Sequence, residues 1–172
     1  MRRRSLLLAP ALCSILIAAA CGGSSSPTSP TPTPAPAPAA SKAELTVSIA
    51  PSPVTASVCN PKCAGTNGAQ FDFAVSMTIV VRETAGLGGN IDSIDLFSAR
   101  NGAVYSTLNL NPSQIAQFAG TNHVAASGSL SVPLSLLYST PDGGKERTTA
   151  VFVRFTDDKG NAFTQSVTVN VL

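Results

Sequence analysis

Aromatic and basic side chains are scarce in this sequence of 172 residues. It contains no tryptophan and two tyrosines, Tyr105 and Tyr138, which disfavours a carbohydrate-binding platform built on exposed aromatic rings. Three of its eleven basic residues are Arg2, Arg3 and Arg4, so the rest of the chain carries eight basic and nine acidic residues. Because nucleic-acid binding depends on clustered cations that neutralise phosphates, we expect no nucleic-acid partner.

The N-terminal region lacks an apolar run long enough to remain in a membrane. Residues 6–20 form an apolar stretch of about 15 residues, interrupted by Pro10 and Ser14, whereas a spanning helix needs roughly 20. Arginines precede this stretch and small residues end it. The pattern predicts a signal peptide over residues 1–20 that is removed on export.

Residues 17–21, Ile-Ala-Ala-Ala-Cys, resemble the lipobox of bacterial lipoproteins, with Ala18 where that family usually has Leu. The resemblance implies that Cys21 is linked to diacylglycerol, becomes the first residue of the mature protein and carries two or three acyl chains such as palmitate, enough for a durable anchor. Gly22 stands where many Gram-negative lipoproteins have Asp as an inner-membrane signal, which implies the outer membrane, on its periplasmic or surface face. The alternative is an ordinary signal peptide cut near Ala20, with Cys21 unmodified.

A linker follows the cysteine, so that residues 21–41 form the lipidated residue and its tether. Residues 22–40 are almost wholly Gly, Ser, Thr, Pro and Ala, a composition that cannot build a core. Prolines recur nearly every second residue and favour an extended polyproline II spacer. They are Pro27, Pro30, Pro32, Pro34, Pro36 and Pro38. A docking motif for proline-binding domains is the less favoured alternative.

Residues 42–172 show apolar residues at every second position in short runs, the pattern of half-buried strands. These runs predict an all-β, antiparallel β-sandwich of about seven or eight strands. The clear series are Leu45–Val47–Ile49, Phe71–Phe73–Val75–Met77–Ile79–Val81, Leu130–Val132–Leu134–Leu136, Val151–Val153–Phe155 and Phe163–Val167–Val169–Val171, with weaker ones at 94–97 and 104–110. Pro133 indicates an edge strand or a bulge.

One short helix is expected between these strands. Asn111 can cap it, Pro112 suits its first turn and Gly120 can end it, and we expect the helix to bridge the two sheets. Residues 149–172 contain two predicted strands joined by the turn 157–161, and resemble the closing hairpin of bacterial immunoglobulin-like domains. The resemblance implies an immunoglobulin-like sandwich, although the Cys, Trp, Cys pattern is missing. A jelly roll is the main alternative.

Two cysteines remain after Cys13 leaves with the signal peptide and Cys21 is lipidated. In an oxidising envelope compartment, Cys59 and Cys63 are expected to form a disulfide that pins a loop. Redox catalysis and a zinc site are the alternatives, but redox pairs favour CxxC at a helix start, and zinc wants four ligands. We predict no metal and no cofactor.

Other candidate residues are few. His123, the single histidine, is predicted to lie in an exposed loop, because no nucleophile motif accompanies it. Asp157, Asp158 and Asn161 could donate oxygens to calcium, but their spacing matches no EF-hand and a tight turn explains them better. Paired acids for glycoside cleavage could come from Asp72, Glu83, Asp92, Asp95 or Glu146.

These residues favour a non-catalytic module over an enzyme. We expect a lipid-anchored envelope or cell-surface protein with a binding or structural role and no catalytic residues. Its partners would be the membrane, through the N-terminal lipid, and an envelope protein or glycan. A carbohydrate- or peptidoglycan-binding module and an uncharacterised hydrolase are the alternatives.

Overall fold

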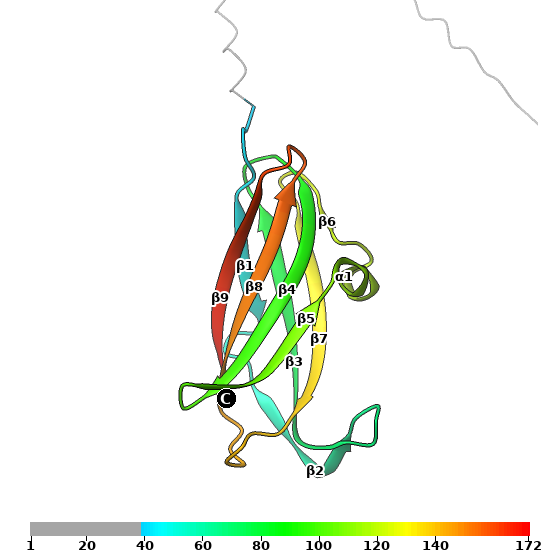
Figure 1. Cartoon of the computed structure of the whole chain (residues 1–172), viewed down its shortest axis with the longest axis vertical. Helices are drawn as coiled ribbons and strands as arrows, with labels where there is room; N and C mark the ends of the chain where they lie inside the picture. Colours follow the sequence, from blue (N-terminus) through cyan, green and yellow to red (C-terminus); the bar gives the residue numbers. More distant parts are fainter. Residues whose placement is uncertain (1–38) are drawn as a thin grey trace, which may run out of the picture. The chain divides into compact units, whose positions relative to one another are not determined.

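The computed structural model describes residues 39–172, so the predictions for the signal peptide, the lipobox with Cys21 and nearly all of the linker lie outside the described residues. The described chain is mostly β, with two antiparallel sheets of four and five strands and one short helix (Figure 1). The helix is not long and apolar enough to cross a membrane.

The four-stranded sheet is built around β3 (Gln70–Glu83). β1 (Leu45–Ala50) pairs with the second half of β3, and β2 (Ala56–Ala64) pairs with its first half. β7 (Ser129–Tyr138) runs along the middle of β3 and overlaps both registers, so β1 and β2 must share the opposite edge. Pro133 therefore lies on an edge strand, as predicted.

The five-stranded sheet has the order β5 (Ala103–Leu110), β4 (Gly89–Arg100), β8 (Arg147–Asp157) and β9 (Ala162–Val171). The short β6 (His123–Val124) pairs with the start of β4. A parallel bridge joins Val54, between β1 and β2, to Val171 of β9. The segment between β1 and β2 therefore joins the edges of the two sheets.

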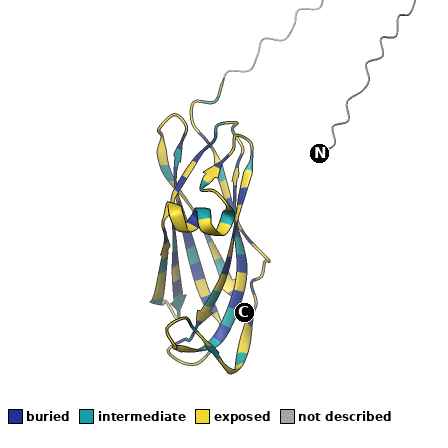
Figure 2. Cartoon of the chain, turned by 90° about the vertical axis from the view of Figure 1, so that its right-hand side faces the viewer, coloured by how far each residue is buried: buried dark blue, intermediate teal, exposed yellow. Residues whose placement is uncertain are grey.

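The core fills the space between the sheets and follows the predicted alternation, which Figure 2 shows as buried and exposed residues alternating along the strands. Each fully buried Val, Ile or Phe side chain stabilises the fold by about 1.5–3 kcal/mol. The inward rows include Val75, Met77, Ile79 and Val81 of β3, Ile94 and Leu96 of β4, and Val151, Val153 and Phe155 of β8.

The predicted helix is α1 (Pro112–Ala119), and it begins with a capping box in which Asn111 and Gln114 exchange hydrogen bonds of 3.0 Å. Gly120 ends it in the left-handed region, at φ 82°. Ile115 is fully buried, and the helix contacts β4 and β5 of one sheet and β7 of the other. It closes one side of the sandwich, which confirms the bridging role.

The strand count needs correction, because the described residues hold nine strands rather than seven or eight. The sequence pattern missed β2 and β6. β2 is an edge strand in which only Ala56 is buried, so it carries no alternating apolar row. His123 lies in the two-residue β6 rather than in a loop, held by backbone pairing with Asn90.

Candidate functional site

The predicted disulfide between Cys59 and Cys63 is present, with 5.4 Å between the two Cα atoms. The register of β2 against β3 shifts between Val58 and Cys63, so the disulfide closes a bulge on the edge of the sheet. Lys62 in this bulge lies 3.0 Å from Asp72. Bulges and charges on an edge strand hinder pairing with other chains, and a structural role therefore accounts for this loop.

Glu83, one of the predicted acid candidates, is fully buried at the end of β3 and acts as a structural clamp. Burial alone would raise the pKa of its carboxyl, but backbone hydrogen bonds outweigh burial and lower the pKa below its ordinary value. The donors are the backbone N–H groups of Glu44, Ala85, Gly86, Leu87 and Ser127. The clamp joins the start of β1 to the β3–β4 and β6–β7 loops.

Asp157 plays a similar part in the turn that was considered for calcium. Its carboxylate accepts hydrogen bonds from the backbone N–H groups of Ala43, Lys159 and Asn161 and from the Asn161 amide. Burial opposes ionisation, but these donors hold the pKa of Asp157 at about 2. Asp158 instead faces His123. Among residues 39–172, no three His, Cys, Asp or Glu side chains are grouped to hold a metal ion.

His123 and the acid candidates Asp72, Asp92 and Asp95 each have local partners, whereas the Glu146 carboxylate forms no hydrogen bond or ion pair within residues 39–172. The imidazole Nε2 lies 3.4 Å from Asp158 Oδ1, both side chains are nearly half exposed, and no serine bonds the imidazole in the described chain. The remaining carboxylates meet side chains on neighbouring segments. Asp72 accepts from Ser139, Asp92 accepts from Thr156, and Asp95 accepts from Asn109 and lies 3.6 Å from Arg154.

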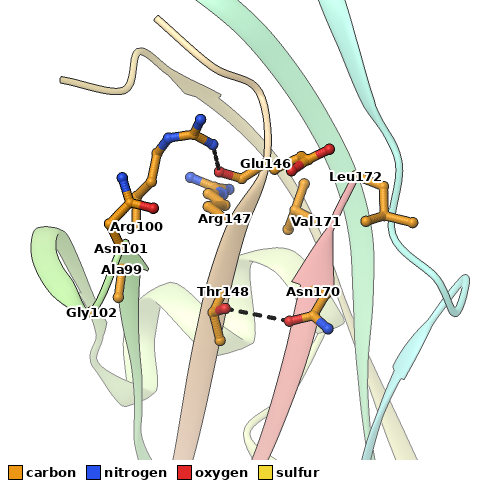
Figure 3. Close-up of a pocket in the computed structure, with 10 residues that line it drawn as sticks. All are labelled: Ala99, Arg100, Asn101, Gly102, Glu146, Arg147, Thr148, Asn170, Val171 and Leu172. Carbon is orange, nitrogen blue, oxygen red and sulfur yellow. Dashed lines mark hydrogen bonds between the residues drawn. The ribbon is translucent and has the colours of Figure 1, made fainter. Parts of the chain in front are cut away.

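The candidate site is a pocket of about 540 Å³ where the β4–β5 turn, the start of β8 and the end of β9 meet. We call it the end pocket, defined by residues 99–102, 146–148 and 170–172 (Figure 3). It lies at the end of the sandwich opposite the first described residues, 39–42 (Figure 1). At that opposite end, Ala40 and Ser41 accept hydrogen bonds from Lys159 and Asn161 of the β8–β9 turn.

Arg147 is the unusual residue of the end pocket. It occupies an inward-facing position of β8, in line with Thr149 and Val151, and only 6% of its surface is exposed. Its guanidinium stacks on the Tyr138 ring, 3.8 Å from the centroid. Within residues 39–172, Nε and Nη2 of Arg147 are buried and have no hydrogen-bond partner. A buried cation without a hydrogen-bond partner is costly, so Arg147 is a candidate functional residue.

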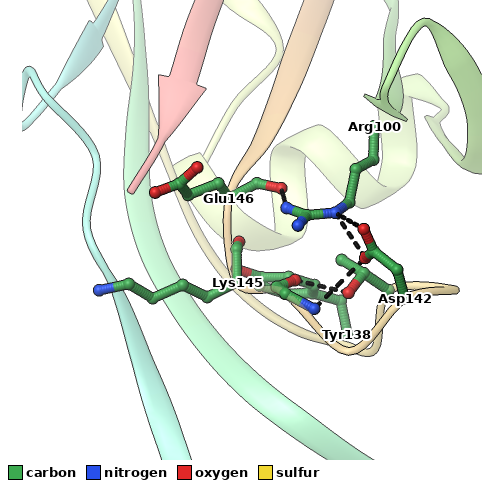
Figure 4. A network of polar contacts seen from close by, with 7 residues as sticks. Arg100, Tyr138, Asp142, Lys145 and Glu146 are labelled. Carbon is green, nitrogen blue, oxygen red and sulfur yellow. Dashed lines mark hydrogen bonds and ion pairs between the residues drawn. The ribbon is translucent and has the colours of Figure 1, made fainter.

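Arg100, by contrast, has hydrogen-bond partners. Its Nε lies 2.6 Å from Oδ2 of Asp142, and its Nη1 donates to the backbone carbonyl of Glu146 (Figure 4). The hydrogen bond from Asp142 raises the pKa of Arg100, and the same bond lowers the pKa of Asp142. A Cβ at Gly144 would lie 2.0 Å from Arg100 Nη2, so a larger residue there would displace the Arg100 guanidinium. Arg100 therefore fastens the β7–β8 loop to β4.

Tyr138 lies beside Arg147, and Tyr105 lies near Tyr138 and Arg100. Tyr138 packs against Phe73, with ring centroids 5.2 Å apart, and donates its hydroxyl to the Lys145 carbonyl at 2.7 Å. Burial is the largest influence on Tyr138 and raises the pKa of its hydroxyl. The hydroxyl of Tyr105 is buried and, in the part of the chain described, has no partner. The Tyr138 ring thus packs against the Arg147 guanidinium from outside the set of residues that line the end pocket.

None of these four residues was predicted as a site from the sequence. The signal was present in β8, where Arg147 shares the parity of Thr149, Val151, Val153 and Phe155 and must therefore face inward. The convergence of Tyr105, Tyr138 and Arg100 depends on pairing between distant strands, which sequence spacing does not reveal.

A second surface lies on the outer face of the five-stranded sheet. Phe97 and Phe152 are 38% and 37% exposed there, in an edge-to-face contact with ring centroids 5.6 Å apart. Asp95, Arg154 and Thr164 complete a shallow pocket around them. We call these five residues the Phe face. It is an alternative candidate for a binding surface, because it presents two partly exposed aromatic rings with polar neighbours.

Comparison with known protein families finds no match, and comparison with curated proteins finds none either. Two solved structures are similar. The Northeast Structural Genomics Consortium target SoR45 has a TM-score of 0.52 at 8% identity, covering 73% of this chain and 84% of its own. The putative ApaA protein from Bordetella pertussis has a TM-score of 0.53 at 10% identity, covering 74% and 92%. At such identities the likeness shows the fold alone: residues 39–172 form a β-sandwich of the kind found in these structures.

Proposed function

We propose that this chain is a lipid-anchored protein of the bacterial cell envelope whose β-sandwich is a non-catalytic binding module, with the end pocket as its binding site. The observation that carries the proposal is Arg147, a buried guanidinium with two free donors in a pocket. The end pocket is also lined by Arg100, Asn101, Thr148 and Asn170, whose side chains can hold ligands by hydrogen bonds.

The strand order supports an immunoglobulin-like sandwich as the finer description. β3 lies between β1 and β7 in one sheet, and β5, β4, β8 and β9 follow in order in the other. These orders correspond to the ABE and C′CFG sheets of immunoglobulin-like domains. Such domains bind partners through loops at the ends of the sandwich, which is where the end pocket lies.

The proposed lipid anchor and the position of the end pocket are consistent with the same role. Cys21 would be held in the outer membrane, and the linker would enter the domain near Ala40. The end pocket lies at the far end of strands such as β4, whose twelve residues span about 40 Å. A binding site at the end of the sandwich opposite Ala40 suits a protein that meets a partner in the envelope or at the cell surface.

The anchor is tested by expressing the full chain in a Gram-negative host and partitioning cell extracts between detergent and aqueous phases. We expect the wild-type chain in the detergent phase and Cys21→Ala in the aqueous phase or left unprocessed. Cys13→Ala is the matched control, because Cys13 lies inside the predicted signal peptide. If Cys21→Ala partitions like the wild type, the lipid anchor is wrong.

The binding site is tested by thermal shift on the processed chain, residues 21–172 with Cys21→Ser, against peptidoglycan fragments and neutral and acidic polysaccharides. A ligand that binds the native state raises Tm. A shift lost in Arg147→Met but kept in Phe152→Ala assigns the end pocket. The converse favours the second candidate, a saccharide-binding surface at the Phe face, where the exposed rings of Phe97 and Phe152 could stack on sugars.

A further inference from the structure

We propose that the outer face of the five-stranded sheet, with the Phe face at its centre, is a self-association surface on which a second copy of this chain packs. The inference goes beyond the proposed function, because the Phe face shares no residue with the end pocket. Three observations carry it, namely the apolar centre of the face, the balance of its charges and its area.

The centre of this face is apolar and open to solvent. Phe97 of β4 is paired with Ala150 of β8, and Phe152 of β8 is paired with Asp95 of β4, so the two rings are diagonal neighbours. Along β7, the outer face of the four-stranded sheet instead presents Ser129, Ser131, Pro133, Ser135 and Leu137. Burying the two rings against a second apolar surface is favourable, because both still expose apolar area to water.

The side chains around the rings are small and mostly uncharged. None of the strands β4, β5, β8 and β9 contains lysine or glutamate. The outward neighbours of the rings are Thr107 and Asn109 of β5 and Thr164, Ser166 and Thr168 of β9. Lysine and glutamate are depleted where proteins bind one another, whereas aromatic residues and arginine are enriched there. The composition of the face is therefore typical of an interface.

The two charges in the Phe face are self-complementary. The Arg154 side chain is 67% exposed, and its Nε lies 3.6 Å from Asp95 but forms no hydrogen bond with it in the described chain. A two-fold axis that runs along the strands, between β4 and β8, would place β8 of each copy over β4 of the other and bring Arg154 toward Asp95 of the second copy. An interface between identical surfaces needs such a balance, because a face with charges of one sign would repel its own copy.

The area of the face is sufficient for a dimer. Its strands lie about 4.8 Å apart and β9 is 10 residues long, so two copies face to face would bury on the order of 1,200 Å² in total, the lower end of the range for specific interfaces. Packed sheets keep their strands within about 30° of each other. The same two-fold axis therefore leaves residues 39–42 of both copies at one end, where both of the proposed lipid anchors could enter one membrane.

The test in solution is sedimentation velocity of the processed chain over a range of concentrations. We expect a reversible equilibrium between monomer and dimer. Phe152→Ser should raise the dissociation constant at least tenfold, because both copies lose the ring, and Arg154→Glu should do the same by placing an acid toward Asp95 of the second copy. Leu137→Ser is the matched control, since Leu137 is 36% exposed on the other sheet and Phe152 is 37% exposed, and it should dimerise as the wild type does.

A second measurement uses the full chain in the envelope of a Gram-negative host. Ala150→Cys lies at the centre of the face, and a short bismaleimide should link it to Ala150→Cys of the second copy. Ser131→Cys, on the outer face of β7, should give no such product. Cys59 and Cys63 form a disulfide and do not react with the reagent.

The outcomes separate this inference from the proposed function. A chain that stays monomeric at every concentration and is not cross-linked through Ala150→Cys overturns self-association and leaves the end pocket untested by the result. Cross-linking without dimers in solution supports the inference, because the anchor raises the local concentration. If Leu137→Ser weakens the dimer as much as Phe152→Ser does, the assigned face is wrong. If the chain is monomeric and a polysaccharide raises the Tm of the wild type but not of Phe152→Ser, the Phe face binds saccharide and the inference is overturned.

Discussion

Arg147→Met gives the sharpest test of the reasoning about the end pocket, because it separates a functional cation from a structural one. The substitution removes the buried guanidinium and keeps an unbranched side chain against the Tyr138 ring. If Arg147 is retained for binding, the unliganded protein should be more stable without it. A structural arginine would give the opposite result.

The expected gain follows from opposing contributions. Two buried donors without acceptors cost about 1–3 kcal/mol each. The contact of Arg147 with the Tyr138 ring stabilises the fold by about 2 kcal/mol at most, and a methionine sulfur on the same ring would stabilise it by up to about 1.5 kcal/mol. Replacing a buried charge by an apolar residue is often stabilising by about 1–4 kcal/mol. We therefore expect Arg147→Met to raise the free energy of unfolding by about 1–3 kcal/mol.

The assay is urea unfolding of the processed chain, followed by circular dichroism without ligand, together with thermal unfolding. For a domain of this size, the expected gain corresponds to a rise in Tm of roughly 3–10 °C. Arg82→Met, on the exposed side of β3, should stay within about 0.5 kcal/mol of the wild type. If Arg147→Met is less stable than Arg82→Met by more than about 1 kcal/mol, the guanidinium stabilises the fold and the reasoning is refuted.

Three further predictions concern the rest of the domain. Glu83→Gln should lower the free energy of unfolding by about 2–4 kcal/mol, because an amide cannot accept all five backbone N–H groups, whereas the exposed Glu44→Gln should have little effect in the same urea assay. Replacing Cys59 and Cys63 by Ala should cost about 2 kcal/mol and leave the circular dichroism spectrum native, since the closed loop is short. Stability should be level from about pH 5 to 7 and fall below about pH 4, because the folded-state pKa values of Asp157, about 2, and Glu83 lie below their ordinary values of 3.8 and 4.5. Urea titrations at successive pH values check this, and a flat profile down to pH 3 would contradict it.

Much of the architecture could be predicted from the sequence, because half-buried strands alternate their side chains with period two. The rows at Leu45–Ile49 and Phe71–Val81 are inward rows of β1 and β3, as expected, and the two weaker runs became β4 and β5. The helix was predictable for a local reason, since Asn111, Pro112 and Gly120 act within one or two turns.

The parts that escaped prediction depend on backbone pairing or on distant contacts. β2 and β6 carry no buried row of their own and exist because β3 and β4 offer them hydrogen-bond partners. The end pocket brings together the β4–β5 turn and residues some fifty to seventy positions further along the chain. Only the pairing of β4 with β8 and of β8 with β9 places them side by side.

The two ends of the sandwich also show why a buried charge alone does not mark a site. At the end where residues 39–42 lie, Glu83 and Asp157 are buried, yet both carboxylates accept several backbone N–H groups and join segments of the fold. At the other end, Arg147 is also buried, but its Nε and Nη2 have no hydrogen-bond partner and it forms no ion pair within residues 39–172. Selection for stability alone would remove such a residue, since an apolar side chain fits the same position on β8. The difference between satisfied and unsatisfied buried charges is therefore the reason to assign binding to this end of the domain.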